Sequence, residues 1–337
     1  APGGGVVLKI AVKEKRYLLP LPRIDSSSDG DVSYGAQLRW ANVRGLNHRL
    51  NLTVEEGRYP NGNRRERERE ASLAYTAPFV NDTQWALSGR LQALERVTPL
   101  DDERNYQETY HRAEVLAIRD LTTGRPRHGW RIGGGLFVED EANKGEFAPP
   151  SEGHTTALVG VATYEDLRFH VYSETGRKFE ARAEVAAEGL GSDYGYEMWQ
   201  ARYFQSRPWG ERDHQTWHLI GLLGERRGGP MPRDVYSLGG SSRLRGYESE
   251  FLLGDRVYYG SVEWLRPIHR DWLRGVLMLE AGGTDRDRDG LRNASPFASI
   301  GLGLRMRFTW FVDLEFELGI AYPLRGGGGA RFFAGAH

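Results

Sequence analysis

Apolar and polar residues alternate along most of this 337-residue chain. From Val32 to Trp40 every second residue is apolar, and the residues between them are polar or small. The same alternation runs from Phe179 to Val185 and from Ala298 to Met306. Strict period-two alternation gives a β-strand one apolar face and one polar face. The sequence therefore predicts a series of strands that are each apolar on one side.

The number and length of these segments predict the architecture. We count about sixteen, beginning near Tyr17, Val32, His48, Glu68, Trp85, His111, Trp130, Thr155, Lys178, Tyr194, His214, Arg256, Gly275, Phe297, Val312 and Ala330. Many run about 10 to 12 residues, close to the ~9 to 11 that cross a bilayer at a tilt, whereas soluble strands average about 5 to 6. An even count places both termini on one side of the membrane. We predict an all-β fold, a transmembrane antiparallel β-barrel of about 16 strands.

The composition agrees with a barrel and argues against other classes. Hydrophobic residues make up 39% of the chain, and no apolar run approaches the ~18 residues of a spanning helix. Low hydropathy is compatible with a barrel because only alternate residues face lipid. The 45 Lys and Arg residues are balanced by 46 Asp and Glu residues, so we expect no nucleic-acid partner. Cysteine is absent, which rules out disulfides and thiolate metal sites.

A soluble β-sandwich is the competing architecture, because its strands also alternate. Its apolar face would be rich in large residues. In this chain many positions on the apolar face are alanine or glycine, and charged residues occupy the other face of nearly every strand. A wide, wet lumen accommodates those charges. The membrane barrel is therefore favoured, and a soluble β protein that binds ligands or surfaces remains the alternative.

One connection is much longer than its neighbours. About 30 residues join the segments that begin near His214 and Arg256, and long loops in compact domains usually carry function. The centre of this loop reads GGSSRLRGY, from Gly239 to Tyr247. In the two strands that follow, Glu263 and Glu280 lie on the polar face, so we expect them to point into the lumen.

This part of the chain resembles the bacterial surface-antigen superfamily of outer-membrane barrels, which includes BamA-like assembly factors and two-partner secretion transporters. The R-G-[FY] loop tip of that superfamily is matched by Arg245–Tyr247, and its inward glutamate before an R-P pair is matched by Glu263. Its F-x-D-x-G motif becomes M-L-E-A-G at Met278–Gly282, with glutamate in place of aspartate and methionine in place of phenylalanine. The resemblance covers essentially the whole chain and implies that the loop tip folds back into the lumen.

We predict that Arg245 pairs in the lumen with Glu263, Glu280 or both, because a guanidinium group can serve two carboxylates and stays charged. Gly246 would let the backbone turn tightly, and Tyr247 would wedge against the inner wall. The competing interpretation is an exposed loop arginine. The loop approach consists of Gly239, Gly240 and Leu244.

The resemblance also implies a function, a location and partners. The barrel would insert or transport polypeptides at the bacterial outer membrane, with the inserted loop gating the lumen. An extended substrate would engage the seam between the first and last strands, where unpaired backbone groups can template a new strand. The partners would be membrane lipid, an extended polypeptide, and periplasmic POTRA domains with accessory lipoproteins. Two alternatives remain, the translocator domain of a patatin-type autotransporter and a passive diffusion porin.

Other motifs are weak. Asp285, Asp287 and Asp289 begin a calcium-loop pattern, but Pro296 stands where that loop needs a glutamate. The chain contains no H-E-x-x-H zinc motif and no G-x-S-x-G nucleophile elbow. We therefore expect no metal, no cofactor and no enzymatic activity.

We divide the chain into two regions. Residues 1–15 are interpreted as a linker or the remnant of a periplasmic POTRA domain, and residues 16–337 as the barrel domain. The opening APGGG has neither a basic start nor an apolar core, so we identify no signal peptide. Pro20 and Pro22 in the first strand suit a weakly paired edge, because proline cannot donate to a β-ladder.

Overall fold

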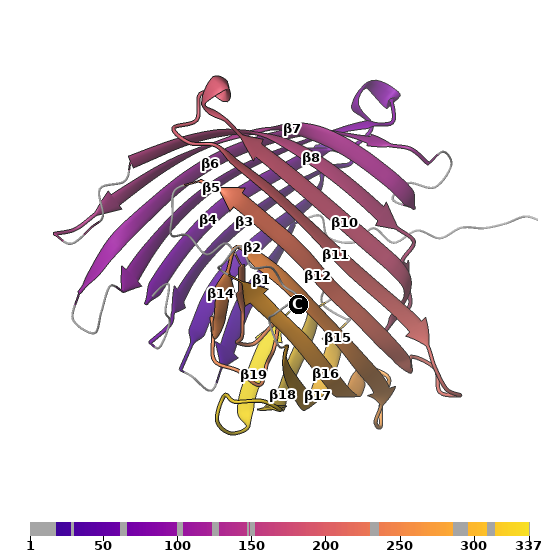
Figure 1. The fold of residues 1–337 in the computed structure, drawn as a ribbon. Coiled ribbons are helices and arrows are strands. Elements are labelled where there is room, and N and C mark those ends of the chain that lie inside the picture. Colours follow the sequence, from indigo (N-terminus) through magenta and orange to yellow (C-terminus); the bar gives the residue numbers. More distant parts are fainter. Residues whose placement is uncertain are drawn as a thin grey trace, which may run out of the picture.

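The computed structural model describes residues 18–27, 30–60, 66–99, 104–122, 128–146, 148, 152–229, 236–285, 296–308 and 314–336. Within these ranges, sixteen antiparallel strands pair in chain order, and the last pairs with the first to close a barrel (Figure 1). The predicted strand number and closure are confirmed. The region proposed as a POTRA remnant or linker, residues 1–15, lies outside the described residues, as do Asp287 and Asp289 of the calcium-loop pattern.

The sixteen barrel strands are β1 Leu18–Ser27, β2 Val32–Val43, β3 His48–Arg58, β4 Arg67–Ala77, β5 Trp85–Pro99, β6 Asn105–Asp120, β7 Gly129–Lys144, β8 Glu152–Glu165, β10 Glu174–Ala186, β11 Tyr196–Pro208, β12 Thr216–Gly228, β15 Arg256–Pro267, β16 Leu273–Asp285, β17 Phe297–Phe308, β18 Leu314–Pro323 and β19 Arg331–Ala336. The connections contain the short strands β9 Arg168–Phe169, β13 Tyr236–Leu238 and β14 Leu252–Gly254, and the 3-10 turns η1 Val80–Asp82 and η2 Glu188–Leu190.

Most strands begin within a few residues of their predicted starts, and β6 differs most. It begins at Asn105 rather than near His111. The added residues at the start of this strand are polar on both faces: Gln107 and Thr109 lie on the outer face and Glu108 on the inner face. Apolar alternation therefore marks where a strand faces lipid, and it underestimates a strand that extends beyond the membrane.

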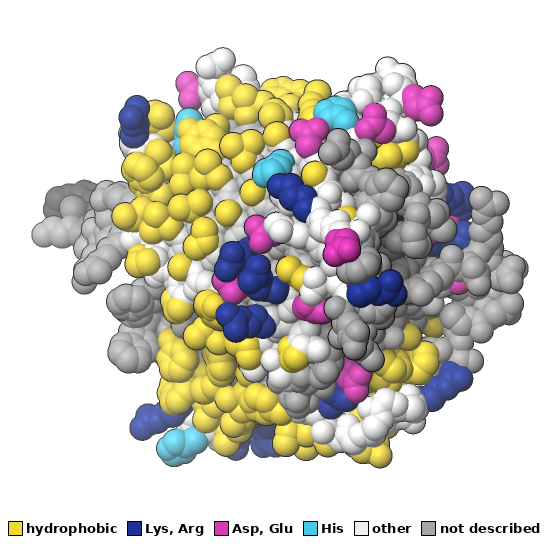
Figure 2. Space-filling view, turned by 90° about the vertical axis from the view of Figure 1, so that its left-hand side faces the viewer, with side chains coloured by type: hydrophobic (Ala, Val, Ile, Leu, Met, Phe, Trp, Pro, Cys, Tyr) yellow, Lys and Arg dark blue, Asp and Glu magenta, His cyan; other side chains and the backbone are white. Residues whose placement is uncertain are grey.

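The two faces of the sheet differ in the way a membrane barrel requires. On the outer face Val262 is 49% exposed and Leu279 is 52% exposed, whereas the neighbouring Glu263 and Glu280 on the inner face are almost completely buried. Figure 2 shows charged side chains near the centre of the view, with hydrophobic side chains covering broad areas around them. A soluble sandwich would bury its apolar face instead. A closed antiparallel barrel with an apolar exterior and a charged interior is the architecture of outer-membrane proteins.

None of the described residues forms a helix long and apolar enough to cross a membrane.

Among the described residues, the seam between β1 and β19 is the shortest pairing between two of the sixteen barrel strands. It joins three residue pairs, from Asp25 with Gly335 to Ser27 with Phe333. On its other side β1 pairs with β2 through nine residue pairs. Pro20 and Pro22 lie in the part of β1 that β19 does not reach. Among the described residues, this stretch of β1 is therefore a strand edge next to the seam.

Candidate functional site

The long connection between β12 and β15 forms a hairpin packed inside the barrel. Its arms are β13 and β14, which pair with each other rather than with the barrel wall. The tip of this hairpin, residues 239–251, is called the lumenal loop below. The hairpin packs in an apolar cluster that it shares with β12 and β15. The buried members of this cluster are Leu222, Tyr236, Leu238, Leu244, Tyr247, Val257 and Tyr259. This cluster fixes the loop against one side of the barrel.

The predicted loop approach has a backbone shape that requires glycine. Gly239 and Gly240 have φ angles of 119° and 96°. A Cβ atom on Gly239 would lie 1.9 Å from the carbonyl oxygen of Glu248. The Gly240 N–H donates to the carbonyl of Tyr247 over 3.1 Å, which closes the loop. Leu244 adopts a positive φ of 49° and is fully buried. These residues hold the turn that presents Arg245.

Arg245 lies in the lumen, and the structure brings it together with both glutamates named from the sequence. Its backbone N–H donates to Glu280 Oε2 over 2.8 Å, and its Nη2 donates to Glu263 Oε1 over 3.0 Å. The arginine is only 6% exposed. Burial alone would lower the pKa of its guanidinium, but Glu263, Glu280 and a third carboxylate, Glu317, raise that pKa above its ordinary value. Arg245 therefore carries its charge inside the barrel.

Glu317 and Arg305 complete the network around Arg245, and sequence reasoning missed both. Glu317 Oε1 lies 3.3 Å from Arg245 Nη1, while its Oε2 accepts from Arg305 Nε over 2.6 Å. Glu263 bridges the same two arginines, because its Oε2 accepts from Arg305 Nη2 over 2.7 Å. Two carboxylates thus each join the loop arginine to a wall arginine. Both residues stand on predicted polar faces, but only the register of β17 with β18 shows that they are cross-strand partners.

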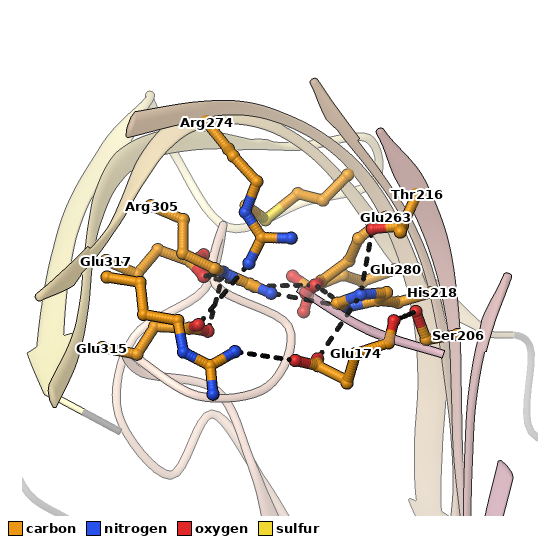
Figure 3. Close-up of polar contacts among 12 residues, drawn as sticks. Glu174, Ser206, Thr216, His218, Glu263, Arg274, Glu280, Arg305, Glu315 and Glu317 are labelled. Carbon is orange, nitrogen blue, oxygen red and sulfur yellow. Dashed lines mark hydrogen bonds and ion pairs between the residues drawn. The ribbon is translucent and has the colours of Figure 1, made fainter. Parts of the chain in front are cut away.

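The same network continues towards the end of the lumen where β11 turns into β12 and β15 turns into β16, called the short-turn end below. Figure 3 shows its side chains. His218 Nδ1 lies 3.8 Å from Glu263 and its Nε2 lies 3.6 Å from Glu174. Glu174 in turn accepts from Arg307 over 3.1 Å. Arg274 is almost completely buried and lies 3.5 Å from Glu315. The polar side chains therefore form a continuous network across β10, β12 and β15 to β18, in which His218 lies between Glu263 and Glu174.

The guanidinium of Arg245 also packs against apolar groups. Its Nη1 lies 2.7 Å from Met278 Sδ, and the ring of Phe333 lies 5.3 Å from the guanidinium carbon. Phe333 comes from β19, so the aromatic ring missing at position 278 is supplied from another strand. Glycine makes room for it, since a Cβ on Gly319 would lie 2.5 Å from the Phe333 ring.

Gly246 and Tyr247 fasten the loop to the wall at β17 and β18. A Cβ on Gly246 would lie 2.8 Å from Pro323 N, and Gly246 does not have a positive φ. Close approach to the wall, rather than an unusual backbone angle, therefore requires glycine at this position. The Tyr247 hydroxyl lies 2.9 Å from the carbonyl oxygens of Ala298 and Arg325, to which it donates.

The arrangement is suited to holding a loop in place. Five glutamates and four arginines pair inside the barrel: Glu174, Glu263, Glu280, Glu315 and Glu317 with Arg245, Arg274, Arg305 and Arg307. Within the part of the chain that the structure describes, no three His, Cys, Asp or Glu side chains are grouped so that they could hold a metal ion.

Comparisons with known proteins support the fold. No protein-family model and no curated protein matches the chain. Among solved structures, BamA from Haemophilus ducreyi lacking POTRA domains 1-3 has a TM-score of 0.71 and 14% identity, covering 96% of this chain and 71% of that one. CdiB from Acinetobacter baumannii has a TM-score of 0.73 and 13% identity, covering 96% and 60%. CdiB from Escherichia coli has a TM-score of 0.71 and 14% identity, covering 97% and 64%.

The chain spans less than two thirds of either CdiB chain. At identities this low the likeness concerns the fold, and it extends over nearly the whole of the present chain. The resemblance to this group of barrels is thereby confirmed at the level of the fold. The chain is a sixteen-stranded outer-membrane β-barrel with the fold of the BamA and CdiB barrels.

Proposed function

We propose that this barrel inserts or transports polypeptides at the outer membrane, and that the lumenal loop gates its lumen. The observation that carries the proposal is the position of Arg245, buried between carboxylates of β15, β16 and β18. A passive pore has no need of a loop fastened by several ion pairs at once. The role of Arg245 is to hold the loop, with no part in bond-making chemistry.

The proposed gate gains its strength from several contacts that break together. Removing one partner of a dry, buried ion pair costs ~3 to 5 kcal/mol, whereas a solvated pair contributes ~1 kcal/mol or less. Arg245 pairs with Glu263, Glu280 and Glu317, and Tyr247 is fastened separately. Thermal motion alone would therefore open the loop rarely, and a substrate that displaces the loop must compensate these contacts.

The proposed path for a polypeptide includes the seam. Among the described residues β19 pairs with β1 only from Asp25 to Ser27, and the backbone groups of β1 before Asp25 are where an extended substrate could add a strand. Under this proposal, POTRA domains and accessory lipoproteins would deliver the substrate, and residues 1–15 would be the remnant of, or the linker to, such a domain.

Single-channel conductance of the refolded barrel in a planar bilayer tests the gate. We expect small, flickering currents from the wild type and larger or longer openings from Arg245→Ala. Arg243→Ala is the matched control, because it removes the same charge from the same loop, and Arg243 has no ion pair with any described residue. A steady, large current that Arg245→Ala leaves unchanged would overturn the gate and favour the porin.

A second observation separates the proposal from an autotransporter. The reading frame upstream of residue 1 would encode POTRA repeats if the chain serves other polypeptides. A hydrolase motif there would instead identify a barrel that carries its own passenger, and it would overturn the proposed substrate class while leaving the gate intact.

A further inference from the structure

The outer face of the barrel carries a row of tryptophans at the end with the short turns. Four of the nine tryptophans of the chain lie around the ends of β11, β12, β15 and β16, namely Trp209, Trp217, Trp264 and Trp272. Trp217 and Trp264 are direct cross-strand partners. Trp209 in the adjoining turn is 62% exposed. Tryptophan in such a position lies at the level of the lipid headgroups.

Two arginines flank this tryptophan pair. Arg207 is the cross-strand partner of Trp217, and its guanidinium lies 5.9 Å from the indole ring. Arg266 lies 6.0 Å from the ring of Trp264 on the same outward face. Both arginines are exposed, and neither lies within ion-pair distance of a carboxylate among the described residues. Three neighbouring strands therefore carry Arg207 on β11, Trp217 on β12, and both Trp264 and Arg266 on β15.

Outward arginines at the opposite rim are arranged differently. Arg69 pairs with Glu56 over 3.1 Å, and Arg256 pairs with Glu225 over 2.7 Å. These charges are neutralised within the protein. At the short-turn end the acidic residues of this sector stand in the turns, beyond the tryptophans: Glu211, Asp213 and Asp271. The guanidinium of Arg207 contacts the neutral side-chain amide of Gln205, so the positive charges of Arg207 and Arg266 are both left to meet the membrane surface.

We propose that Arg207, Trp217, Trp264 and Arg266 form a binding site for the phosphate of an anionic phospholipid in the leaflet at the short-turn end. Guanidinium binds phosphate through paired N–H groups, and an indole ring within about 6 Å adds a cation–π attraction that favours this position of the charge. The two arginines stand on strands two apart, roughly 10 Å. This spacing lets both guanidinium groups contact phosphates within a single cluster of headgroups.

Single arginine–aromatic pairs occur elsewhere at the same end and provide a matched control. Arg119 lies 5.9 Å from the ring of Trp85, and Arg177 lies 5.2 Å from the ring of Tyr164. These two pairs are separated by β7, so their charges do not converge on one place. The double variant R119Q/R177Q removes the same charge from the same belt as R207Q/R266Q.

Native mass spectrometry of the folded barrel, titrated with phosphatidylglycerol or phosphatidylcholine, tests the site. We expect wild type to bind the first phosphatidylglycerol more tightly than phosphatidylcholine. R207Q/R266Q should weaken that binding by roughly 30-fold, about fivefold for each charge, whereas R119Q/R177Q should weaken it by about fivefold or less. R207K/R266K, which keeps the charges but loses the planar fork, should lie between wild type and R207Q/R266Q.

Two outcomes would overturn the proposal. Equal binding of both lipids by wild type would mean that the arginines do not select anionic headgroups. Equal losses in R207Q/R266Q and R119Q/R177Q would mean that binding follows total charge rather than a built site. Heat-dependent migration on a denaturing gel verifies that each variant is folded before it is titrated.

Discussion

Replacing Glu263 by glutamine perturbs the lumenal network at its centre. Glu263 is completely buried and joins Arg245 to Arg305 over 3.0 and 2.7 Å. Glutamine has nearly the same shape but no charge, so the two guanidinium groups lose their shared counter-ion. Glutamine also places an amide N–H₂ where an acceptor is needed for one of the two arginines. The variant therefore tests whether the network stabilises the loop, with little change in packing.

The magnitude follows from the contacts that remain. Breaking a dry buried pair costs ~3 to 5 kcal/mol. Here Glu317 still contacts both arginines, and glutamine keeps one acceptor, so we expect a loss of about 2 kcal/mol in the free energy of unfolding. About half of that loss comes from the contact between Glu263 and the loop residue Arg245, and the other half comes from the contact between Glu263 and Arg305 of the barrel wall. A loss of about 1 kcal/mol at the loop raises the open population roughly fivefold.

Limited trypsin digestion separates these two effects from each other. Trypsin cleaves after Arg243 or Arg245 only when the loop leaves the lumen, so the cleavage rate follows the open population when opening is fast. Urea unfolding measures the total loss. Glu165→Gln is the control, because Glu165 pairs with Arg131 over 3.1 Å on a half-buried stretch of wall away from the loop. We expect it to cost at most about 1 kcal/mol and to leave cleavage unchanged. Equal cleavage rates in the two variants would refute the reasoning.

Three further predictions concern the loop tip and the seam. Tyr247→Phe removes a hydroxyl that donates to two backbone carbonyls over 2.9 Å, so urea unfolding should show a loss of about 1 kcal/mol; no loss would mean that these bonds do not fasten the loop. Gly246→Val places a side chain 2.8 Å from Pro323 N, so it should cost about 1 to 3 kcal/mol and speed trypsin cleavage, whereas unchanged cleavage would contradict the close approach. In hydrogen exchange of this 337-residue chain, amides of residues 18–24 should exchange faster than those of β2, because among the described residues β1 pairs with β19 only from Asp25 to Ser27; equal protection would contradict this pairing.

Much of the fold could be predicted from the sequence because a membrane barrel repeats one rule in every strand. Residues that face lipid must be apolar, and their neighbours face a wet lumen. The alternation from Val32 to Trp40 therefore marks β2 without any knowledge of its partners. Where a strand extends beyond the membrane the rule stops applying, which is why the start of β6 at Asn105 differed from the predicted start.

The site was only partly predictable, because contacts across the lumen depend on register and on which side chains reach the centre. The pairing of Arg245 with Glu263 and Glu280 could be proposed from a local motif. The contribution of Glu317 could not be predicted, because it lies 72 residues from Arg245 and no motif around it indicates contact with the loop. Phe333 is even farther from Arg245 in sequence, and it becomes a neighbour only because β19 returns to β1.

The same closure connects the two parts of the proposed mechanism. Phe333 lies beneath the guanidinium of Arg245, and its cross-strand partner is Ser27 of β1, one of the three residue pairs of the seam. A movement of β19 away from β1 would shift a ring that packs against the loop arginine, and release of the loop would leave that ring without its main polar neighbour. Because interfaces of packed side chains change between discrete arrangements rather than continuously, we infer that loop release and seam opening favour each other. The lumen and the seam are then two parts of one gate, joined through a single aromatic side chain.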